Sequence, residues 1–318
     1  MDQRILIISP VRNEAAHFER VARAVAAQGQ PPTRWIVVDD GSDDGTLELA
    51  EGLADEIPFM TVISAPPATV PSARDRLAQA AAPRTFNFVL GLDDPQNYDF
   101  IGKLDGDIEL PPDYFAQLCE RFRRDPEIGI ACGDLVEDHH GQWRRIPIPP
   151  HHVHGAVKFY SRECFKQIGG VQTRLGWDTI DETYARLHGY RTRSFRDIVA
   201  RHHRAWGSAD GVLRGRARHG RCAYIVHYPF PWVALRSLKL AGARPYGLSG
   251  AAFLWGWLHA RADRTQRVDD PDFRRQVRRE LSNRIRAKAG QPKSSVKSEV
   301  RLRSSRCSPE ATEGADTR

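Results

Sequence analysis

The feature that most constrains the fold is an alternation of short apolar segments with amphipathic ones over the first hundred residues. Residues 4–9, R-I-L-I-I-S, are almost continuously apolar, which is typical of a parallel strand buried on both faces. Residues 15–28 instead carry Phe18, Val21 and Val25 at helical spacing. Further strands are expected at 35–38, 61–64, 86–90 and 101–104, and further helices at 47–53 and 72–81. This alternation predicts an α/β protein with a doubly wound sheet.

Polar clusters follow three of these predicted strands. They are residues 10–14 (P-V-R-N-E), residues 39–46 (D-D-G-S-D-D-G-T) and residues 105–107 (D-G-D). In doubly wound sheets ligands bind outside the carboxyl ends of the strands. The three clusters therefore predict one binding site along a single edge of the sheet.

The D-G-D cluster itself suggests a metal site. Asp105 and Asp107 are two positions apart, so on an extended segment their carboxylates point to the same side. A divalent cation with a preference for oxygen ligands would remove their mutual repulsion and could bridge to a diphosphate. Taken alone, Asp-Gly is also ordinary turn chemistry, and a polar turn before a helix is the simpler interpretation.

The second cluster also has the spacing of a calcium loop. Asp40, Ser42, Asp44, Gly45 and Glu51 occupy positions 1, 3, 5, 6 and 12 of an EF-hand pattern. An EF-hand requires a helix before the loop, however, and the preceding residues predict a strand. We therefore expect no EF-hand here.

Together these motifs resemble inverting glycosyltransferases of family 2, over residues 5–192. The resemblance rests on S-P-V-R-N-E, I-V-V-D-D-G-S-D-D-G-T, an Ala-Arg pair at 73–74 and K-L-D-G-D, in that order. It implies a GT-A type doubly wound mixed sheet, a nucleotide-sugar donor and a Mn²⁺ or Mg²⁺ ion. The residues that it implies for donor binding are Pro10, Asn13, Glu14, Asp39, Asp40, Arg74 and Asp105. Asp39 would contact the base, and Asp105 and Asp107 would form the metal motif, with Asp107 the favoured direct ligand.

The same resemblance implies an acidic acceptor-side motif within residues 176–190, G-W-D-T-I-D-E-T-Y-A-R-L-H-G-Y. An inverting transfer needs a general base for the acceptor hydroxyl. The chain departs from the usual Glu-Asp pair, so Asp178 is our first candidate, Asp181 the second, and Glu182 the third. Alternatively, Asp178 caps the helix and the other two acids complement its positive end.

Histidines could complete the metal site. Residues 198–203 predict a strand that ends in His202 and His203, and in GT-A enzymes a histidine at this place can be a third ligand. A polar strand end is the equally good alternative. Residues 139–154 predict a loop with three further histidines, His151, His152 and His154, whose spacing does not favour one shared ion.

The remainder divides into an appendage and a tail. We expect residues 1–210 to form the transferase domain, 211–289 a helical appendage, and 290–318 a disordered basic tail. The appendage contains a run with three arginines at 211–220, which could close over the diphosphate, followed by aromatic and basic segments. Such segments are typical of helices that lie on an anionic membrane surface, although helices packed on the domain or a dimer interface would fit as well.

Composition favours a cytoplasmic location. The N-terminus has no secretory pattern, no segment is long enough to span a bilayer, and the five cysteines are scattered. Of 47 basic and 40 acidic residues, 16 and 9 lie from Arg261 onward, so the net charge of +7 belongs to this end. A specific nucleic-acid partner is not expected.

We therefore expect a membrane-peripheral glycosyltransferase on the inner face of the membrane, acting on a lipid-linked or polysaccharide acceptor. A non-catalytic nucleotide-sugar-binding assembly protein is the alternative from another class. A nucleotidyltransferase is the alternative enzyme, although it would require a glycine-rich loop after the first strand.

Overall fold

The computed structural model describes residues 3–66, 80–139, 141–204 and 211–289. The strands are β1 Ile5–Val11, β2 Arg34–Asp39, β3 Met60–Ser64, β4 Phe100–Leu104, β5 Ile108–Glu109, β6 Ile128–His139, β7 Gln142–Arg145, β8 Val157–Ser161 and β9 Arg191–His202. The helices are α1 Ala15–Ala26, α2 Thr46–Glu56, α3 Ala81–Leu90, a 3₁₀ turn at Pro95–Asn97, α4 Tyr114–Arg124, α5 Arg162–Gln167, α6 Trp177–Leu187, α7 Val212–Ile225, α8 Phe230–Ala241, α9 Leu248–Ala262 and α10 Pro271–Ala289.

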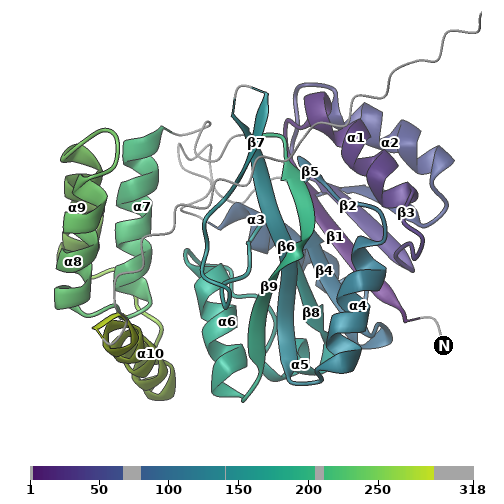
Figure 1. Ribbon diagram of the computed structural model, residues 1–318. Coiled ribbons are helices and arrows are strands. Elements are labelled where there is room, and N and C mark those ends of the chain that lie inside the picture. Colours follow the sequence, from purple (N-terminus) through teal and green to yellow (C-terminus); the bar gives the residue numbers. More distant parts are fainter. Residues whose placement is uncertain (1–2, 67–79, 140, 205–210, 290–318) are drawn as a thin grey trace, which may run out of the picture. The chain divides into compact units, whose positions relative to one another are not determined.

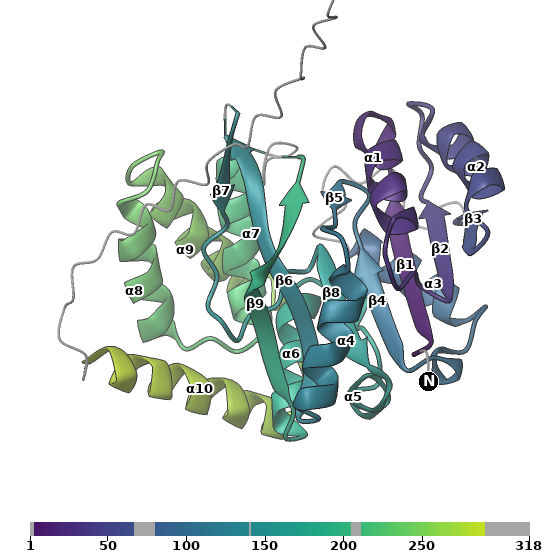
Figure 2. The same ribbon diagram turned by 45° about the vertical axis from the view of Figure 1, so that its right-hand side comes forward.

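In the described part of the chain the strands form one mixed sheet, in the order β3-β2-β1-β4-β8-β6-β9-β5, with β7 paired to β6 (Figures 1 and 2). Strands β1 to β4 are parallel, β8 is antiparallel to β4, and β9 is parallel to β6. The carboxyl ends of β1, β2 and β4 therefore share one edge, as predicted.

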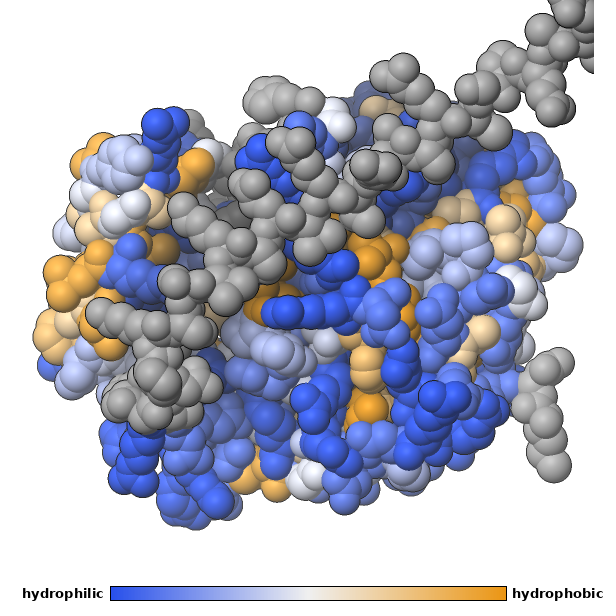
Figure 3. All heavy atoms as spheres, in the orientation of Figure 1, coloured by the Kyte–Doolittle hydropathy of each residue, from blue (hydrophilic) through white to orange (hydrophobic). Residues whose placement is uncertain are grey.

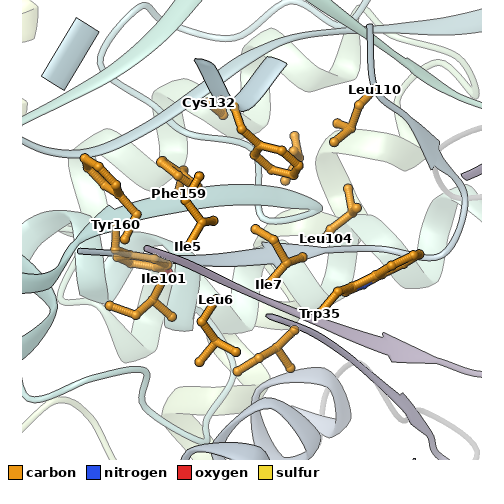
Figure 4. Packing of buried hydrophobic residues seen from close by; sticks show 14 of the residues in the cluster. Ile5, Leu6, Ile7, Trp35, Ile101, Leu104, Leu110, Cys132, Phe159 and Tyr160 are labelled. Carbon is orange, nitrogen blue, oxygen red and sulfur yellow. The ribbon is translucent and has the colours of Figure 1, made fainter. Parts of the chain in front are cut away.

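Strand alternation explains how helices cover both faces of the sheet. On β8, Phe159 contacts Phe115 and Phe122 of α4, with ring centroids 6.0 and 5.9 Å away. The next residue, Tyr160, contacts Phe165 of α5 at 5.2 Å on the opposite face. Figure 4 shows the same alternation on β1, where Ile5 and Ile7 lie on one side and Leu6 on the other.

Two expectations about local structure were wrong. Residues 86–90, expected as a strand, belong to α3, where Phe86 and Val89 are buried one helical turn apart. The short apolar run F-N-F-V-L is compatible with either element, so its pattern alone could not decide. The expected loop 139–154 contains β7, a polar strand that pairs at the edge of β6. The expected helix at 72–81 lies almost wholly outside the described residues.

Helices α7 to α9 pack closely because glycines lie where they meet. A Cβ on Gly220 of α7 would lie 1.9 Å from the carbonyl oxygen of Phe253 in α9, and one on Gly256 would lie 1.9 Å from that of Ala217.

Residues Met1–Leu281 form one compact unit, and a second runs from Ser282 to Arg318. The segment 290–318 lies outside the described residues.

Candidate active site

The loops after β1 and β2 are joined by hydrogen bonds at the sheet edge. Asn13 has a positive φ of 54°, which asparagine tolerates better than most residues. Its backbone amide donates to Ser42 Oγ at 3.1 Å, and its side-chain Oδ1 accepts from the Asp43 amide at 3.0 Å. Asn13 therefore helps to hold the two loops in a fixed relation.

Asp39 ends β2 and is buried, with 4% of its surface exposed. Its Oδ2 accepts hydrogen bonds from the backbone amides of Gly41 and Ser42, at 3.0 and 3.1 Å. The backbone oxygen of Asp40 accepts from Arg12 at 2.7 Å. The turn after β2 thus fixes the orientation of the Asp39 carboxylate, and Pro10 lies on the neighbouring β1.

The calcium-loop alternative does not fit this structure. Asp44 would be the fifth position of the calcium loop. Its carboxylate accepts hydrogen bonds from the backbone amides of Ala15 and Thr46, at 3.1 and 3.0 Å. These are amides at the starts of α1 and α2, so Asp44 acts as a helix cap. The element before the loop is β2, where an EF-hand requires a helix.

The D-G-D segment follows β4 directly. Asp105 forms an ion pair with Lys103, whose ammonium also donates to the Gly155 oxygen at 3.0 Å. Burial raises the pKa of Asp105; Lys103 lowers it, and the nearby Asp107 adds to the rise. Asp105 therefore already has a cationic partner in Lys103, whereas Asp107 contacts His202.

Gly106 allows the loop after β1 to approach the two aspartates. A Cβ at this position would lie 2.9 Å from Val11 Cγ1 and 3.1 Å from Glu14 Cγ. Burial, followed by the negative charge of Asp107, raises the pKa of Glu14 to about 8. Three carboxyl groups close enough to raise one another's pKa make this place one where added positive charge is stabilising.

His202 lies between two carboxylates. Its Nε2 is 3.3 Å from Asp107 Oδ2, and its Nδ1 is 3.2 Å from Glu137 Oε1. Burial alone would lower the pKa of His202, but the hydrogen bond to Asp107 outweighs it and raises that pKa. Burial would likewise raise the pKa of Asp107, and the contact with His202 lowers it overall.

His203 points elsewhere. Its Nε2 is 2.6 Å from Glu109 Oε2, and its ring lies 5.4 Å from that of Trp143 on β7, edge to face. Only its backbone amide contacts the metal motif, donating to the Asp107 oxygen at 3.0 Å. Of the two histidines, the structure thus brings the His202 ring to Asp107.

Arg204 adds a cation that the sequence reasoning missed. Its Nη2 donates to the Asn13 oxygen at 2.9 Å and to Glu14 Oε2 at 2.6 Å, and its Nε lies 3.9 Å from Asp107 Oδ2. Arg204 therefore links the end of β9 to the loop after β1.

Residues present at this edge fit a divalent cation. Two ligands at right angles in an octahedral shell, each about 2.1 Å from the ion, lie about 3 Å apart, close to the separation of His202 Nε2 and Asp107 Oδ2. Among the described residues no group of three or more His, Cys, Asp or Glu side chains is arranged to hold an ion. Magnesium commonly takes only one or two carboxylates together with substrate phosphates, so a complete protein cage is not required.

The acidic motif on α6 separates into different roles. Asp181 is 2% exposed and accepts from Lys158 at 2.8 and 2.9 Å and from the Tyr160 hydroxyl at 2.6 Å. Glu182, equally buried, accepts from the Val153 amide at 2.8 Å and lies 3.0 Å from His152 Nδ1. Both carboxylates are thus fully engaged inside the protein.

Asp178 differs from these two acids because it is half-buried in the first turn of α6. Its carboxylate accepts from the adjacent Thr179 amide at 3.0 Å and has no ion-pair partner among the described residues. A Cβ on Gly155 would lie 3.6 Å from Asp178 Cβ, and the Gly155 oxygen accepts from Lys103, the partner of Asp105. Asp178 is therefore linked to the D-G-D segment indirectly, through Gly155 and Lys103.

Other residues named from the sequence are not among those that the structure brings to the metal motif. Arg74 lies outside the described residues. His154 Nε2 is 3.9 Å from Asp134, and His152 contacts Glu182, so these two histidines face different acids. The buried ion pair of Lys158 with Asp181 had one signal in the sequence, namely a lysine within the otherwise apolar strand V-K-F-Y-S.

A family model described as Glycosyl transferase family 2 matches residues 6–173, slightly more than half of the chain. No curated protein matches the chain.

Several solved structures share the fold at low sequence identity. The mannosyltransferase PcManGT from Pyrobaculum calidifontis, solved with GDP-Man and Mn²⁺, has a TM-score of 0.53 and 17% identity, covering 90% of this chain and 81% of that one. TarS from S. aureus has a TM-score of 0.51 and 13% identity, covering 89% and 49%. GalNAc-T7, solved with UDP, GalNAc and Mn²⁺, has a TM-score of 0.53 and 15% identity, covering 90% and 57%. These likenesses show a GT-A fold.

Proposed function

Because the chain belongs to glycosyl transferase family 2, and is thus a glycosyltransferase, we propose that it moves a sugar from a nucleotide-sugar donor to a lipid-linked or polysaccharide acceptor. The transfer is metal-dependent and inverts the anomeric configuration. The observation that carries this proposal is the pairing of His202 with Asp107 at the edge where β1, β2 and β4 end.

The donor lies across the carboxyl ends of these strands. Asp39 contacts the base and Asn13 shapes the loop around the nucleotide; Pro10, Glu14, Asp40 and Arg74 complete the set that we assign to the donor. Support comes from PcManGT, solved with GDP-Man, and from a TarS fragment solved with UDP at a TM-score of 0.50 and 14% identity.

Asp107 and His202 would hold the divalent ion, with Asp105 beside them. When bound, a Mn²⁺ or Mg²⁺ ion supplies positive charge that stabilises the diphosphate leaving group. Lys103 forms an ion pair with Asp105 and orients its carboxylate. His203 takes no part as a ligand, because its ring is held by Glu109.

Asp178 takes the proton from the acceptor hydroxyl. It is the one acid of the α6 motif that is both partly exposed and without an ion-pair partner in the described residues. The hydroxyl oxygen then attacks the anomeric carbon from the face opposite the diphosphate, in one displacement. Asp181 and Glu182 are positioning residues, because Asp181 is paired with the buried Lys158 and Glu182 contacts His152.

We place this activity in the cytoplasm, on the inner face of the cell membrane. In the described residues no helix has the length and apolar character to cross a bilayer. The four cysteines in that part are free thiols, which suits a reducing compartment. We retain 1–210 as the transferase domain, 211–289 as its appendage and 290–318 as a basic tail.

A screen of nucleotide-sugars tests the proposed function. Donor binding, followed by calorimetry, is expected to need Mn²⁺ or Mg²⁺ and to weaken at least about ten-fold in Asp107→Asn and in His202→Gln, since each loses a metal ligand. His203→Gln is the matched control and is expected to bind normally.

Transfer or hydrolysis of the bound donor then separates an enzyme from a non-catalytic binding protein. Metal-independent binding, or equal losses in His202→Gln and His203→Gln, would contradict the assigned metal site.

A further inference from the structure

Positive and negative charges balance over the first 260 residues as a whole, but one stretch of them carries an excess of positive charge. Between Asp210 and Asp263 the sequence contains no aspartate or glutamate. The same stretch contains eight cationic side chains: Arg214, Arg216, Arg218, Arg221, Arg236, Lys239, Arg244 and Arg261. Helices α7 to α9 thus form a part of the protein that attracts anions over its whole length.

Exposed apolar side chains gather in the same stretch. In the described residues, the large apolar side chains with high exposure are Val212, Leu213, Phe230, Leu235, Leu238, Tyr246, Leu248, Trp255 and Leu258, and elsewhere only Leu92. Monomeric proteins rarely expose large apolar side chains in contiguous groups without a partner. Figure 3 shows orange residues gathered over α8 and α9, at the left of the view.

Helical spacing places the exposed residues of each helix on the side opposite its own buried residues. In α8, Val233 and Ser237 are buried, while Leu235 and Leu238 lie about half a turn away and are 59% and 73% exposed. In α9, Phe253 and Trp257 are buried, and Leu248, Trp255 and Leu258 are exposed on the opposite side. We call Leu235, Leu238, Leu248, Trp255 and Leu258 the outer apolar face.

The residues of this face are not part of the hydrophobic core of the helices. The inner sides of the two helices already meet in a cluster of Ala223, Val233, Phe253 and Trp257. The outer apolar face is flanked instead by Lys239, which is exposed, and by the cations at 244 and 261. Long basic side chains beside leucine and tryptophan are typical of helices that lie in the headgroup region of a bilayer.

We propose that the outer apolar face of α8 and α9 docks on an anionic lipid bilayer, with the helices lying in its surface. The positive charge of these helices favours an anionic bilayer over the other possible occupants of this face. A second copy would bring one carboxylate-free cationic face against another, and residues 290–318 carry six basic and four acidic side chains, so they too are cationic. The docking rests on the proposed function in one respect, because it would bring the site to a lipid-linked acceptor.

Vesicle co-sedimentation of the full chain tests the docking without donor or metal. Wild type is expected to sediment with vesicles of phosphatidylcholine and phosphatidylglycerol, to be released by high salt, and not to sediment with phosphatidylcholine alone. Leu238→Glu/Trp255→Glu should weaken sedimentation about ten-fold or more, since both charges would enter the apolar region. Lys239→Glu should weaken it through charge alone.

Leu92→Glu is the matched control, because Leu92 and Trp255 are equally exposed at 63% and Leu92 lies at the end of α3. It should sediment like wild type. Equal sedimentation with neutral vesicles, or equal losses in Leu92→Glu and the double variant, would overturn the proposal. Nucleotide-sugar binding measured without vesicles tests the transferase assignment separately, so the two failures are distinguishable.

Discussion

Lys158 and Asp181 form a buried ion pair whose two nitrogen–oxygen distances are 2.8 and 2.9 Å, and neither side chain is more than 1% exposed. The same ammonium donates to the backbone oxygen of Asp178 at 2.8 Å. Its Nζ also lies 5.0 Å from the ring of Trp177. A strand residue thus anchors the first turn of α6, where the proposed base lies.

Removing one partner of this pair should be costly. Lys158→Met leaves the Asp181 carboxylate buried without a cation, which typically costs about 3–5 kcal/mol. Denaturant unfolding should show this loss. Lys158→Met/Asp181→Leu removes both charges and should recover much of it. A double variant as unstable as the sum of the single ones would show that the two residues do not act as a pair.

The contact between His152 and Glu182 should make stability depend on pH. Burial alone would lower the pKa of His152, but Glu182 outweighs it and raises that pKa above its ordinary 6.5. A raised pKa stabilises the fold below the unfolded value, and this contribution disappears as pH rises through the folded one. The stability of wild type relative to His152→Gln should therefore be greatest below about pH 6.5 and shrink above it.

At acidic pH, Glu182 makes stability depend on pH in the opposite direction. Burial would raise the pKa of Glu182, but His152 and Lys158 lower it from 4.5 to about 2. Its contribution is thus present above pH 4.5 and is lost as pH falls toward 2. Urea unfolding of wild type, His152→Gln and Glu182→Gln over both pH ranges measures both effects. Parallel pH profiles for the three proteins would contradict them.

Glycines on α7 offer a matched test of helix packing. A Cβ on Gly220 would lie 1.9 Å from the Phe253 oxygen, whereas one on Gly215 would meet nothing within 4 Å among the described residues. Gly220→Ala should destabilise the protein by about 1–3 kcal/mol through overpacking. Gly215→Ala should gain about 0.5–1 kcal/mol from helix propensity. Similar melting temperatures for the two variants would show that α7 and α9 pack less closely.

Sequence patterns predicted the strands whose burial is continuous. β1, β2 and β4 were found because I-L-I-I, W-I-V-V and F-I-G-K-L carry their signal locally. β7 was missed because Gln142–Arg145 is polar and is set by pairing with β6. β6 and β7 are neighbours in the sequence, but their backbone pairing leaves no apolar pattern in a strand made of polar residues.

In the candidate site, too, residues with a local sequence signal could be predicted and residues defined by distant contacts could not. Asp39, Asp105 and Asp107 could be assigned to one edge because each follows a recognisable strand. The partners of Asp181 and Glu182 could not be assigned, since Lys158 and His152 are 23 and 30 residues away from the acids they contact. Without those contacts, Asp178 could be ranked first among the three acids on α6, but the buried roles of Asp181 and Glu182 could not be predicted.

Substituting these acids one at a time should separate catalysis from positioning. Asp178→Asn retains size but cannot accept a proton, so transfer should fall by about 10²–10⁴-fold. Donor affinity and melting temperature should stay close to wild type, because Asp178 makes no ion pair within the described residues. Steady-state rates, donor titration and thermal unfolding measure the three quantities.

Asp181→Asn should behave in the opposite way. It leaves Lys158 buried beside a neutral amide, so its melting temperature should drop, and its transfer rate should follow the fraction of folded protein. The pH profile of transfer is the sharper readout, since losing the base should remove its acidic limb only in Asp178→Asn. A stable Asp181→Asn protein that binds donor but transfers nothing would reverse the two assignments.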